Sequence, residues 1–210
     1  MNILVTAGPT REFIDPVRFI SNRSSGKMGY AVARAALMRG HKVVLVSGPV
    51  SLQAPDGLAV VRVVSAAEMQ SAVEAGVDGC DALVMAAAVS DWRPARVHAN
   101  KLKKRSAPAT LDLEPVPDIL MGLASRKGGR IFVGFAAETE NLLDEARAKL
   151  NSKNLDMIVA NDVSRTDAGF EVDNNAVTFI PAHGEAMALP LMSKDDVAER
   201  LVKWIEARRK

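Results

Sequence analysis

Glycine and small polar residues gather where the first helix of the chain is predicted to begin. Residues 21–29 read SNRSSGKMG, and an apolar pattern of helical period starts at Lys27. A helix N-terminus presents backbone N–H groups and the positive end of the helix dipole, and these together can bind phosphate. An ordinary capped helix start uses the same residues, so the segment predicts either an anion site or a cap.

A carboxylate follows the fourth predicted strand. Residues 86–91 read AAAVSD, so three alanines stand shortly before Asp91. Tiny side chains let a ligand approach the backbone, and a strand-end aspartate can hold a ribose hydroxyl or a cation. A strand that packs against a helix and ends in a capping aspartate has the same sequence, and for this segment taken alone we favour that structural interpretation.

Positive charge is concentrated in residues 91–105, which contain six basic side chains and one acid. This tract carries a net charge of +5, whereas the whole chain carries +2. Most such tracts are solvated surface. This one comes directly after the expected ligand-binding edge of the sheet, which favours a loop that closes over phosphates. We expect residues 101–107 to form such a flap and to be mobile until a phosphate ligand binds.

Five further positions have both a structural and a ligand-binding interpretation. Pro117 and Asp118 are typical of the first turn of a helix. Phe135 ends another apolar strand and faces either a ligand base or the core. Lys149 and Lys153 lie four residues apart on one expected helix face, where they are solvated unless they reach a phosphate.

Several well-known motifs are missing. No two glycines are two positions apart, so the G-x-G-x-x-G dinucleotide fingerprint is absent. Met28 stands where a P-loop requires serine or threonine, and Arg34 stands where a short-chain dehydrogenase has a lysine after its tyrosine. The single cysteine, Cys80, excludes an internal disulfide and a multi-cysteine zinc site, and no histidine has metal-ligand spacing.

Strand-like and helix-like segments alternate along the 210 residues, of which 48% are hydrophobic. Apolar and β-branched runs predict strands at residues 2–6, 42–46, 59–64, 82–87, 131–135 and 157–160. Helical periodicity and capping residues predict helices at residues 27–39, after Ser65, at 141–150 and after Ser193. This order predicts one α/β domain, residues 1–210, with a Rossmann-like, doubly wound and mostly parallel sheet.

Two segments interrupt the alternation. Residues 92–116 are basic and punctuated by prolines, with an alternating strand expected at 110–113. Residues 164–191 are rich in turn residues around a strand at 176–180, which predicts an antiparallel arm or hairpin added to the sheet.

The composition also limits the cellular setting. The longest uncharged apolar run, residues 82–90, has nine residues, whereas a membrane helix needs about 20. The start MNILVTAGPT lacks the basic n-region of a signal peptide. Together with the single cysteine, these features predict a cytoplasmic protein with no membrane partner.

Taken together, the motifs are specific. They are TAGPT (6–10), DPVRFISNRSSGKMG (15–29), SGPV (47–50), AAAVSDW (86–92), KLKK (101–104), PDIL (117–120), VGFAAET (133–139) and IVANDV (158–163). In this order and spacing they resemble phosphopantothenoylcysteine synthetase, the ligase of coenzyme A biosynthesis, over nearly the whole chain.

The resemblance implies an enzyme that joins (R)-4′-phosphopantothenate to L-cysteine. Bacterial members spend CTP, pass through an acyl-cytidylate intermediate, and release pyrophosphate and CMP. They usually form the C-terminal half of a protein whose other half is an FMN-dependent decarboxylase. Because 210 residues leave no room for that half, we expect no FMN here and either a free-standing ligase or an excised domain. The family works as a homodimer with its active site near the subunit interface, for which residues 164–191 are the candidate.

The resemblance also implies roles for individual residues. Lys101 would act in nucleotidyl transfer, and Asn22 would handle the acyl-cytidylate. The nucleotide would lie at Ala87, Asp91, Lys101, Pro117, Asp118, Ile119, Leu120, Phe135, Lys149 and Lys153. The other substrate would lie at Asn22, Ser24, Ser25, Gly26 and Ala88. A Mg²⁺ ion would neutralise the triphosphate, with Asp91 or Asp118 as its carboxylate ligand.

Two other functions use the same features. A nicotinamide-dependent dehydrogenase would share the fold, but the missing glycine fingerprint argues against it, and a failure to bind NADH would exclude it. A nucleic-acid-binding module would use residues 93–105 and bind with steep salt dependence. We expect no nucleic-acid partner, because the only aromatic side chain beside that tract is Trp92. The residues do not distinguish CTP from ATP.

Overall fold

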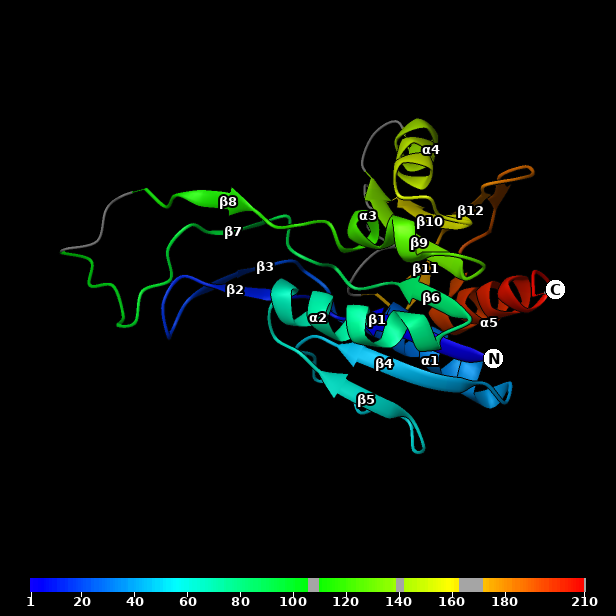
Figure 1. Cartoon of the computed structure of the whole chain (residues 1–210), viewed down its shortest axis with the longest axis horizontal. Helices are drawn as coiled ribbons and strands as arrows, with labels where there is room; N and C mark the ends of the chain where they lie inside the picture. Colours follow the sequence, from blue (N-terminus) through cyan, green and yellow to red (C-terminus); the bar gives the residue numbers. More distant parts are fainter. Residues whose placement is uncertain (106–109, 139–141, 163–171, 210) are drawn as a thin grey trace.

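The computed structural model describes residues 1–105, 110–138, 142–162 and 172–209. Its central sheet is built from β1 (Asn2–Ala7), β4 (Lys42–Ser47), β5 (Ala59–Arg62), β6 (Ala82–Met85), β9 (Ile131–Glu138), β10 (Met157–Asp162), β12 (Val177–Pro181) and β13 (Met187–Ala188). These eight strands lie in the order β13-β12-β10-β9-β6-β1-β4-β5 (Figure 1).

The strand order places a switch point in the middle of the sheet. Six neighbouring strands of the sheet run parallel to one another, namely β10, β9, β6, β1, β4 and β5. At the β10 side, β12 and β13 add an antiparallel edge. Strand β1 pairs with β4 on one side, where Leu4 lies opposite Val44, and with β6 on the other, where Leu4 lies opposite Leu83. The chain therefore winds outward from β1 in both directions. The predicted doubly wound α/β fold, with its antiparallel addition, is confirmed.

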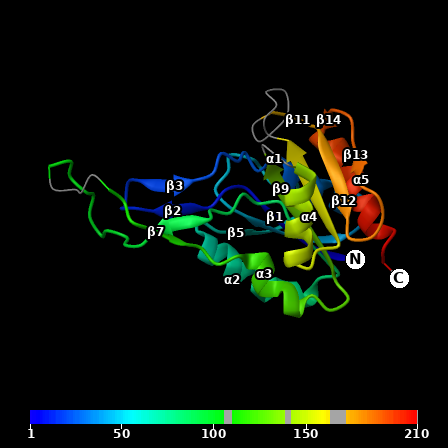
Figure 2. The ribbon, with the colours of Figure 1, turned by 90° about the horizontal axis from the view of Figure 1, so that it is seen from above.

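Helices cover both faces of the sheet (Figure 2). One face carries α1 (Lys27–Met38) and α5 (Lys194–Glu206), which contact each other. The other face carries α2 (Ala66–Gly76), α3 (Ile119–Leu123) and α4 (Leu142–Ser152), with the short 3-10 helices η1 (Val77–Gly79) and η2 (Ala124–Arg126) beside them.

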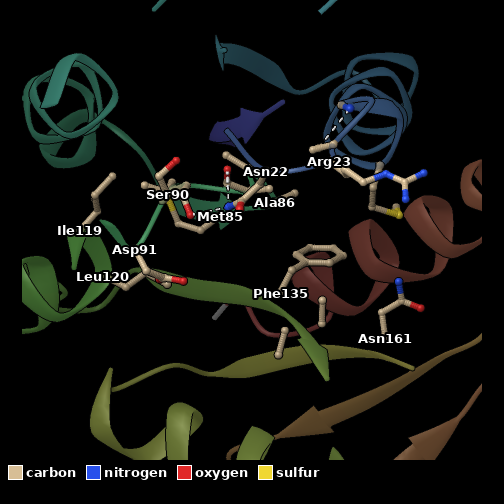
Figure 3. A pocket seen from close by; sticks show the side chains of 18 of the residues that line it. Asn22, Arg23, Met85, Ala86, Ser90, Asp91, Ile119, Leu120, Phe135 and Asn161 are labelled. Carbon is tan, nitrogen blue, oxygen red and sulfur yellow. Dashed lines mark hydrogen bonds between the residues drawn. The ribbon is translucent and has the colours of Figure 1, made fainter. Parts of the chain in front are cut away.

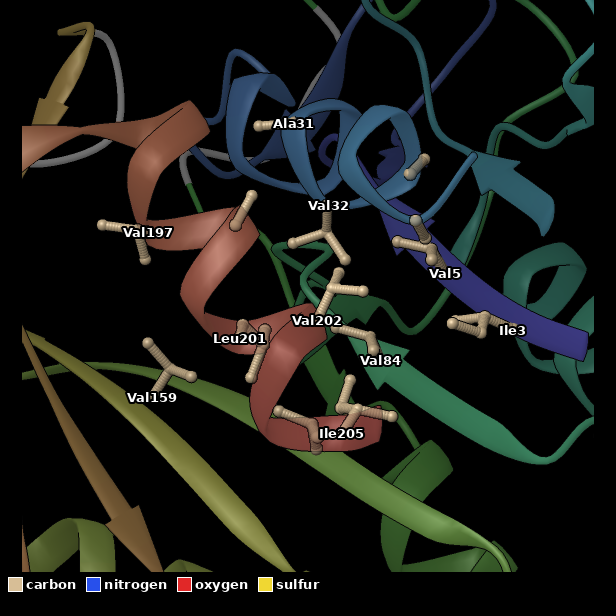
Figure 4. Packing of buried hydrophobic residues seen from close by; sticks show 14 of the residues in the cluster. Ile3, Val5, Ala31, Val32, Val84, Val159, Val197, Leu201, Val202 and Ile205 are labelled. Carbon is tan, nitrogen blue, oxygen red and sulfur yellow. The ribbon is translucent and has the colours of Figure 1, made fainter. Parts of the chain in front are cut away.

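Branched aliphatic side chains make up most of the core beneath α1 and α5. Val202 and Ile205 of α5 and Val32 of α1 are fully buried in the same cluster as Val5 and Val84 of the sheet (Figure 4). Burying each such side chain contributes about 1.5–3 kcal/mol to the free energy that favours folding. Because both faces of the parallel strands are covered, the strands are apolar almost throughout rather than alternating, and they form a rigid support for the loops at their carboxyl ends.

The two predicted capping serines are confirmed. The Ser65 hydroxyl accepts a hydrogen bond from the Glu68 amide at 3.2 Å, and the Ser193 hydroxyl accepts one from the Asp196 amide at 3.1 Å. The start of α3 differs from the prediction. Asp118 is the N-cap and accepts from the Met121 amide at 3.0 Å, so the proline at position 117 precedes the helix instead of opening it.

Two antiparallel ribbons extend away from the sheet, β2 (Arg11–Phe13) with β3 (Phe19–Ser21) and β7 (Trp92–Pro94) with β8 (Leu113–Pro115) (Figure 1). We call residues 11–21, 92–105 and 110–115 the projecting arm; within it, β2 contacts β7. The prediction of a strand at 110–113 is wrong. The pairing of Trp92 with Pro115 fixes a three-residue ribbon, and this moves the strand toward the carboxyl end.

The antiparallel addition predicted at 164–191 is built from two pieces. Strands β12 and β13 extend the edge of the main sheet, and β11 (Asn174–Asn175) pairs with β14 (Met192–Ser193). Residues 164–171 of that segment lie outside the described residues. Across the described ranges, no helix combines the length and the apolar character that a membrane span needs.

Candidate functional site

A cleft of about 620 Å³ opens at the switch point of the sheet (Figure 3). The segment after β6 and the carboxyl-terminal parts of β9 and β10 line it, together with the start of α1 and the turn at 116–120. In Figure 3, Asp91 lies toward one end of the cleft, near Ile119 and Leu120, and Asn161 lies toward the other, beyond Phe135. A crevice at the carboxyl ends of parallel strands is where doubly wound sheets bind their ligands.

Hydrogen bonds from β1 and the loop after it hold the segment after β6 in place. The Thr6 hydroxyl accepts from the Ala87 amide at 3.1 Å, and the Thr10 hydroxyl accepts from the Ser90 amide at 3.0 Å. Thr6, Thr10 and Ser90 are buried. The cleft wall made by the three alanines therefore has a fixed backbone, with small side chains that leave room for a ligand.

Asn22 connects this wall to the start of α1. Its Nδ2 donates to the carbonyl oxygens of Val89 at 2.9 Å and Ala88 at 3.3 Å. The N-cap of α1 is Gly26, with φ of 77° and no side-chain cap hydrogen bond. Asn22 is therefore not the helix cap. It lies at the cleft, where its amide can turn from the two carbonyl oxygens toward a ligand.

The start of α1 fits an anion. Ser24, Ser25 and Gly26 all line the cleft, and no carboxylate lies in the first turn of the helix. A Cβ at Gly26 would approach Val50 Cγ1 to 2.8 Å, and the positive φ also favours glycine. The N-terminal end of the α1 dipole thus meets the cleft without a capping side chain, as a phosphate-binding helix requires.

The opposite wall carries an ion pair. Lys153 Nζ lies 2.7 Å from Asp118 Oδ2, and both residues line the cleft with Lys149. Burial alone would raise the pKa of Asp118, but hydrogen bonds from Lys153 and from the α3 backbone hold it below its usual value. The Asp118 carboxylate therefore stays charged and is committed to Lys153 and to the helix cap.

Asp91 has different surroundings. Its backbone carbonyl accepts from the Val116 amide at 2.8 Å. Within the described ranges its exposed carboxylate makes no hydrogen bond or ion pair. No cluster of three metal-ligating side chains occurs in that part of the chain. This donor set fits Mg²⁺ carried by a polyphosphate, because that ion takes one or two carboxylates and completes its shell with phosphates and water.

Every residue expected at the nucleotide or substrate site lines this cleft, with one exception. Lys101 lies in the projecting arm, between β7 and β8, and is not part of the cleft of its own chain. The expected closing of residues 101–107 over phosphates stays a prediction. Of that proposed flap, residues 106 and 107 lie outside the described residues.

Three buried polar residues at the Asn161 end of the cleft were not among the expected residues. Asn161, Asn175 and Lys194 line the cleft and are 8%, 3% and 5% exposed. Among the described residues, Asn161 Oδ1 has no hydrogen-bond partner. Asn161 ends a buried strand and lies within the motif IVANDV, so the rule that points to Asp91 also points to it. Lys194 follows a capping serine, a position that predicts exposure.

These features define the class of protein: an α/β protein with a polar cleft at the switch point of its doubly wound sheet. The family model described as "DNA/pantothenate metabolism flavoprotein C-terminal domain" matches residues 1–208, and the chain belongs to this family.

Relatives in this family share almost half of the sequence. The chain is 49% identical over 207 residues to the "Coenzyme A biosynthesis bifunctional protein CoaBC" of Bacillus subtilis strain 168, covering 98% of this chain and 51% of that protein. It is 47% identical over 212 residues to the protein of the same name from Escherichia coli strain K12, covering 99% and 52%. The chain spans about half the length of the curated relatives it matches.

Solved structures agree with the fold. A crystal structure of the C-terminal domain of a CoaBC bifunctional protein has a TM-score of 0.84 at 44% identity, with 98% of this chain and 94% of that chain covered. The DNA/pantothenate metabolism flavoprotein from Streptococcus pneumoniae has a TM-score of 0.84 at 24% identity, with 100% of both chains covered. The second likeness concerns the fold alone.

Proposed function

We propose that this chain ligates (R)-4′-phosphopantothenate to L-cysteine at the expense of CTP. In the first step, the phosphopantothenate carboxylate attacks the α-phosphorus of CTP, pyrophosphate leaves, and an acyl-cytidylate forms. In the second, the cysteine amine attacks the acyl carbon, CMP leaves with the bonding electrons, and the amine loses its proton. The products are 4′-phosphopantothenoyl-L-cysteine, CMP and pyrophosphate.

The observation that carries this proposal is the cleft itself. It joins an uncapped helix start at Gly26, the lysines at positions 149 and 153, and an exposed carboxylate at Asp91, in a chain of the pantothenate-metabolism flavoprotein family. Attack by one anion on a phosphorus surrounded by negative charge requires cations and fixed N–H donors around the phosphates. A cleft that has cationic side chains and backbone N–H donors along its walls suits nucleotidyl transfer.

The structure supports a division of roles between the two candidate metal ligands. Asp118 already caps α3 and pairs with Lys153, so it orders the nucleotide-binding turn. Asp91 keeps its carboxylate available, and we assign it to the Mg²⁺ that accompanies the triphosphate. When bound, the ion supplies charge neutralisation to the phosphates.

Asn22 is assigned to the second step. Its amide donates to the Val89 and Ala88 carbonyl oxygens, beside the alanines that would contact the substrate. A small rotation would present the same N–H groups to the acyl oxygen as charge develops there, the arrangement found in oxyanion holes.

The projecting arm supports a homodimer. Its surface exposes several large apolar side chains, including Phe19 at 40%, Val97 at 62% and Leu113 at 44%. Lys101 does not line its own cleft. We therefore assign the arm, rather than residues 164–191 alone, to an interface through which Lys101 reaches the cleft of a second copy.

Mixed dimers test this assignment. When Lys101→Gln and Asn22→Ala subunits are combined, an arm that acts on its partner's cleft gives one intact site per mixed dimer and restores activity. An arm that acts on its own cleft gives no recovery. Light scattering of the unmodified chain establishes the dimer independently.

The proposal extends to the intact protein in which this chain acts and to its cellular compartment. Because the chain matches about half of each bifunctional relative, we propose that an FMN-dependent decarboxylase half accompanies it in the intact protein and that the whole acts in the cytoplasm. The ligase half itself needs no FMN.

One assay tests the ligase function. The chain is incubated with phosphopantothenate, cysteine, Mg²⁺ and either CTP or ATP, and pyrophosphate and product are measured. We expect both with CTP, with pyrophosphate dependent on phosphopantothenate. Pyrophosphate release that ignores phosphopantothenate, or none with any nucleotide, would overturn the proposal.

A further inference from the structure

A buried carboxylate lies in the projecting arm, remote from the cleft. Asp15 is 0% exposed although the arm extends from the body of the protein. Its Oδ1 accepts from the amides of Val17 and Arg18, both at 2.9 Å. Its Oδ2 accepts from Arg18 Nε at 3.0 Å and Nη2 at 2.5 Å, and from the Leu102 amide at 3.1 Å.

Asp15 and Arg18 together hold one residue of the basic tract. Leu102 donates its N–H to Asp15 Oδ2, and its carbonyl oxygen accepts from Arg18 Nη2 at 3.2 Å. Nearby, the His98 amide donates to the Ile14 carbonyl at 2.9 Å. The turn between β2 and β3 therefore fixes the segment that follows β7, more than 80 positions away in the sequence.

The residue held in this way is adjacent to Lys101. Fixing both backbone polar groups of Leu102 restricts the position from which the Lys101 side chain extends, and a catalytic group depends on such precise placement. We propose that Asp15 is a positioning residue that, with Arg18, holds Lys101 in place for nucleotidyl transfer. The inference rests on the proposed function of Lys101.

The charge state of Asp15 suits a permanent clamp. The Arg18 guanidinium and the backbone amides hold the pKa of Asp15 well below its usual range, against the opposing effect of burial. The carboxylate therefore remains an acceptor for all its donors throughout the working range of pH. An amide at this position has one acceptor oxygen in place of two, and it cannot accept from every donor that Asp15 serves.

The first test measures the clamp without reference to activity. In the intact chain, the Leu102 amide should exchange hydrogen slowly, and Asp15→Asn should accelerate that exchange. The matched control is Glu114→Gln, which breaks the 2.7 Å Arg93–Glu114 pair between β7 and β8 of the same arm. The control should leave Leu102 protected. Equal exchange in all three proteins would show that no clamp exists, whatever the protein catalyses.

The second test asks whether the clamp acts through Lys101. Single-turnover formation of the acyl-cytidylate should slow by about 10- to 100-fold in Asp15→Asn, because small misplacements of a catalytic group have effects of this size. In a Lys101→Gln background, Asp15→Asn should have no further effect, since coupled residues are not additive. Additive losses would overturn the positioning role even if the clamp exists.

Arg18→Lys provides a second variant if Asp15→Asn does not fold. It keeps a positive charge beside Asp15 but cannot donate both to the carboxylate and to the Leu102 carbonyl in the same fork. It should reproduce the faster Leu102 exchange. Protection unchanged from the parent would contradict the clamp.

Discussion

Asn22 Nδ2 donates a hydrogen bond of 2.9 Å to the Val89 carbonyl oxygen, across 67 positions of sequence. This contact joins the segment before α1 to the segment after β6, two of the segments that line the switch-point cleft. An amide that bridges these segments is placed at the junction between the helix start and the alanine wall. Because Gly26 is the N-cap of α1, substituting Asn22 tests catalysis without removing a helix cap.

Asn22→Ala should separate the two half-reactions. The nucleotide contacts remain, so pyrophosphate should still form from CTP and phosphopantothenate. Transfer to cysteine should slow by about 10²–10³-fold, the usual cost of losing an oxyanion donor. A single-turnover quench with labelled CTP follows both steps, and the acyl-cytidylate should accumulate in the presence of cysteine.

Asn22→Asp is the companion variant and not a conservative one. Its carboxylate would face the carbonyl oxygens of Ala88 and Val89, which now accept from the amide. We expect it to impair the first step as well, by displacing the wall of the cleft. If Asn22→Ala turns over like the parent, or never forms the intermediate, the assigned role is wrong.

Asp91 and Asp118 should respond differently to the same substitution. Asp91→Ala should weaken CTP binding by about 1.5–3 kcal/mol, the range for a charge-assisted contact, and leave the melting temperature unchanged. Asp118→Ala removes an N-cap and the partner of Lys153. It should cost about 0.5–2 kcal/mol of stability.

Calorimetry with CTP and thermal unfolding of both variants make this comparison. Unchanged CTP affinity in Asp91→Ala, together with a lower melting temperature, would mean that the carboxylate supports the backbone instead of the ligand.

The sequence predicts the parts of the fold that depend on local pattern. Strand β1 and helix α1 follow from an apolar run and a 3.6-residue period, and the caps at Ser65 and Ser193 follow from side chains three residues apart. Strand-end positions of the cleft, such as Asp91 and Phe135, follow from one topological rule, that parallel strands present their carboxyl ends at one edge. The other cleft residues were expected from the family resemblance.

The positions that were missed depend on tertiary contacts. Lys194 occupies a first helical turn, but its ammonium donates to the Val172 carbonyl, so a distant segment buries it. For Lys101, the expected role at the phosphates stays a prediction, but its place in the projecting arm could not be predicted from the sequence. Its position is set by Asp15 and Arg18 acting on Leu102, a docking that no local pattern encodes.

Gly29 of α1 allows the helix to pack directly on β1. A Cβ there would lie 2.6 Å from the Thr6 carbonyl oxygen and 2.5 Å from Ala7 Cβ. Gly29→Ala should therefore destabilise the fold by about 1–3 kcal/mol, because relieving the clash requires the backbone of a central strand to move. Gly122 of α3 is the matched control, because a Cβ there meets nothing within 4 Å.

Gly122→Ala should be neutral or stabilising by up to about 1 kcal/mol, as expected for alanine in a helix. Urea unfolding of the two variants compares them directly. Similar effects of both substitutions would show that helix propensity, and not the approach of α1 to β1, determines the result.

Lys194 should make stability depend on pH on the alkaline side. Burial, with the charge of Lys27 nearby, lowers its pKa from 10.5 to about 8. Below pH 8 the lysine is protonated in both the folded and the unfolded chain, so the folded state bears the full cost of a buried charge. Between 8 and 10.5 the folded state loses this proton first, and the cost disappears. The parent should therefore gain stability relative to Lys194→Met as the pH rises through this window, as measured by urea unfolding of both proteins across it. Parallel stability curves would show that Lys194 stays charged in the fold.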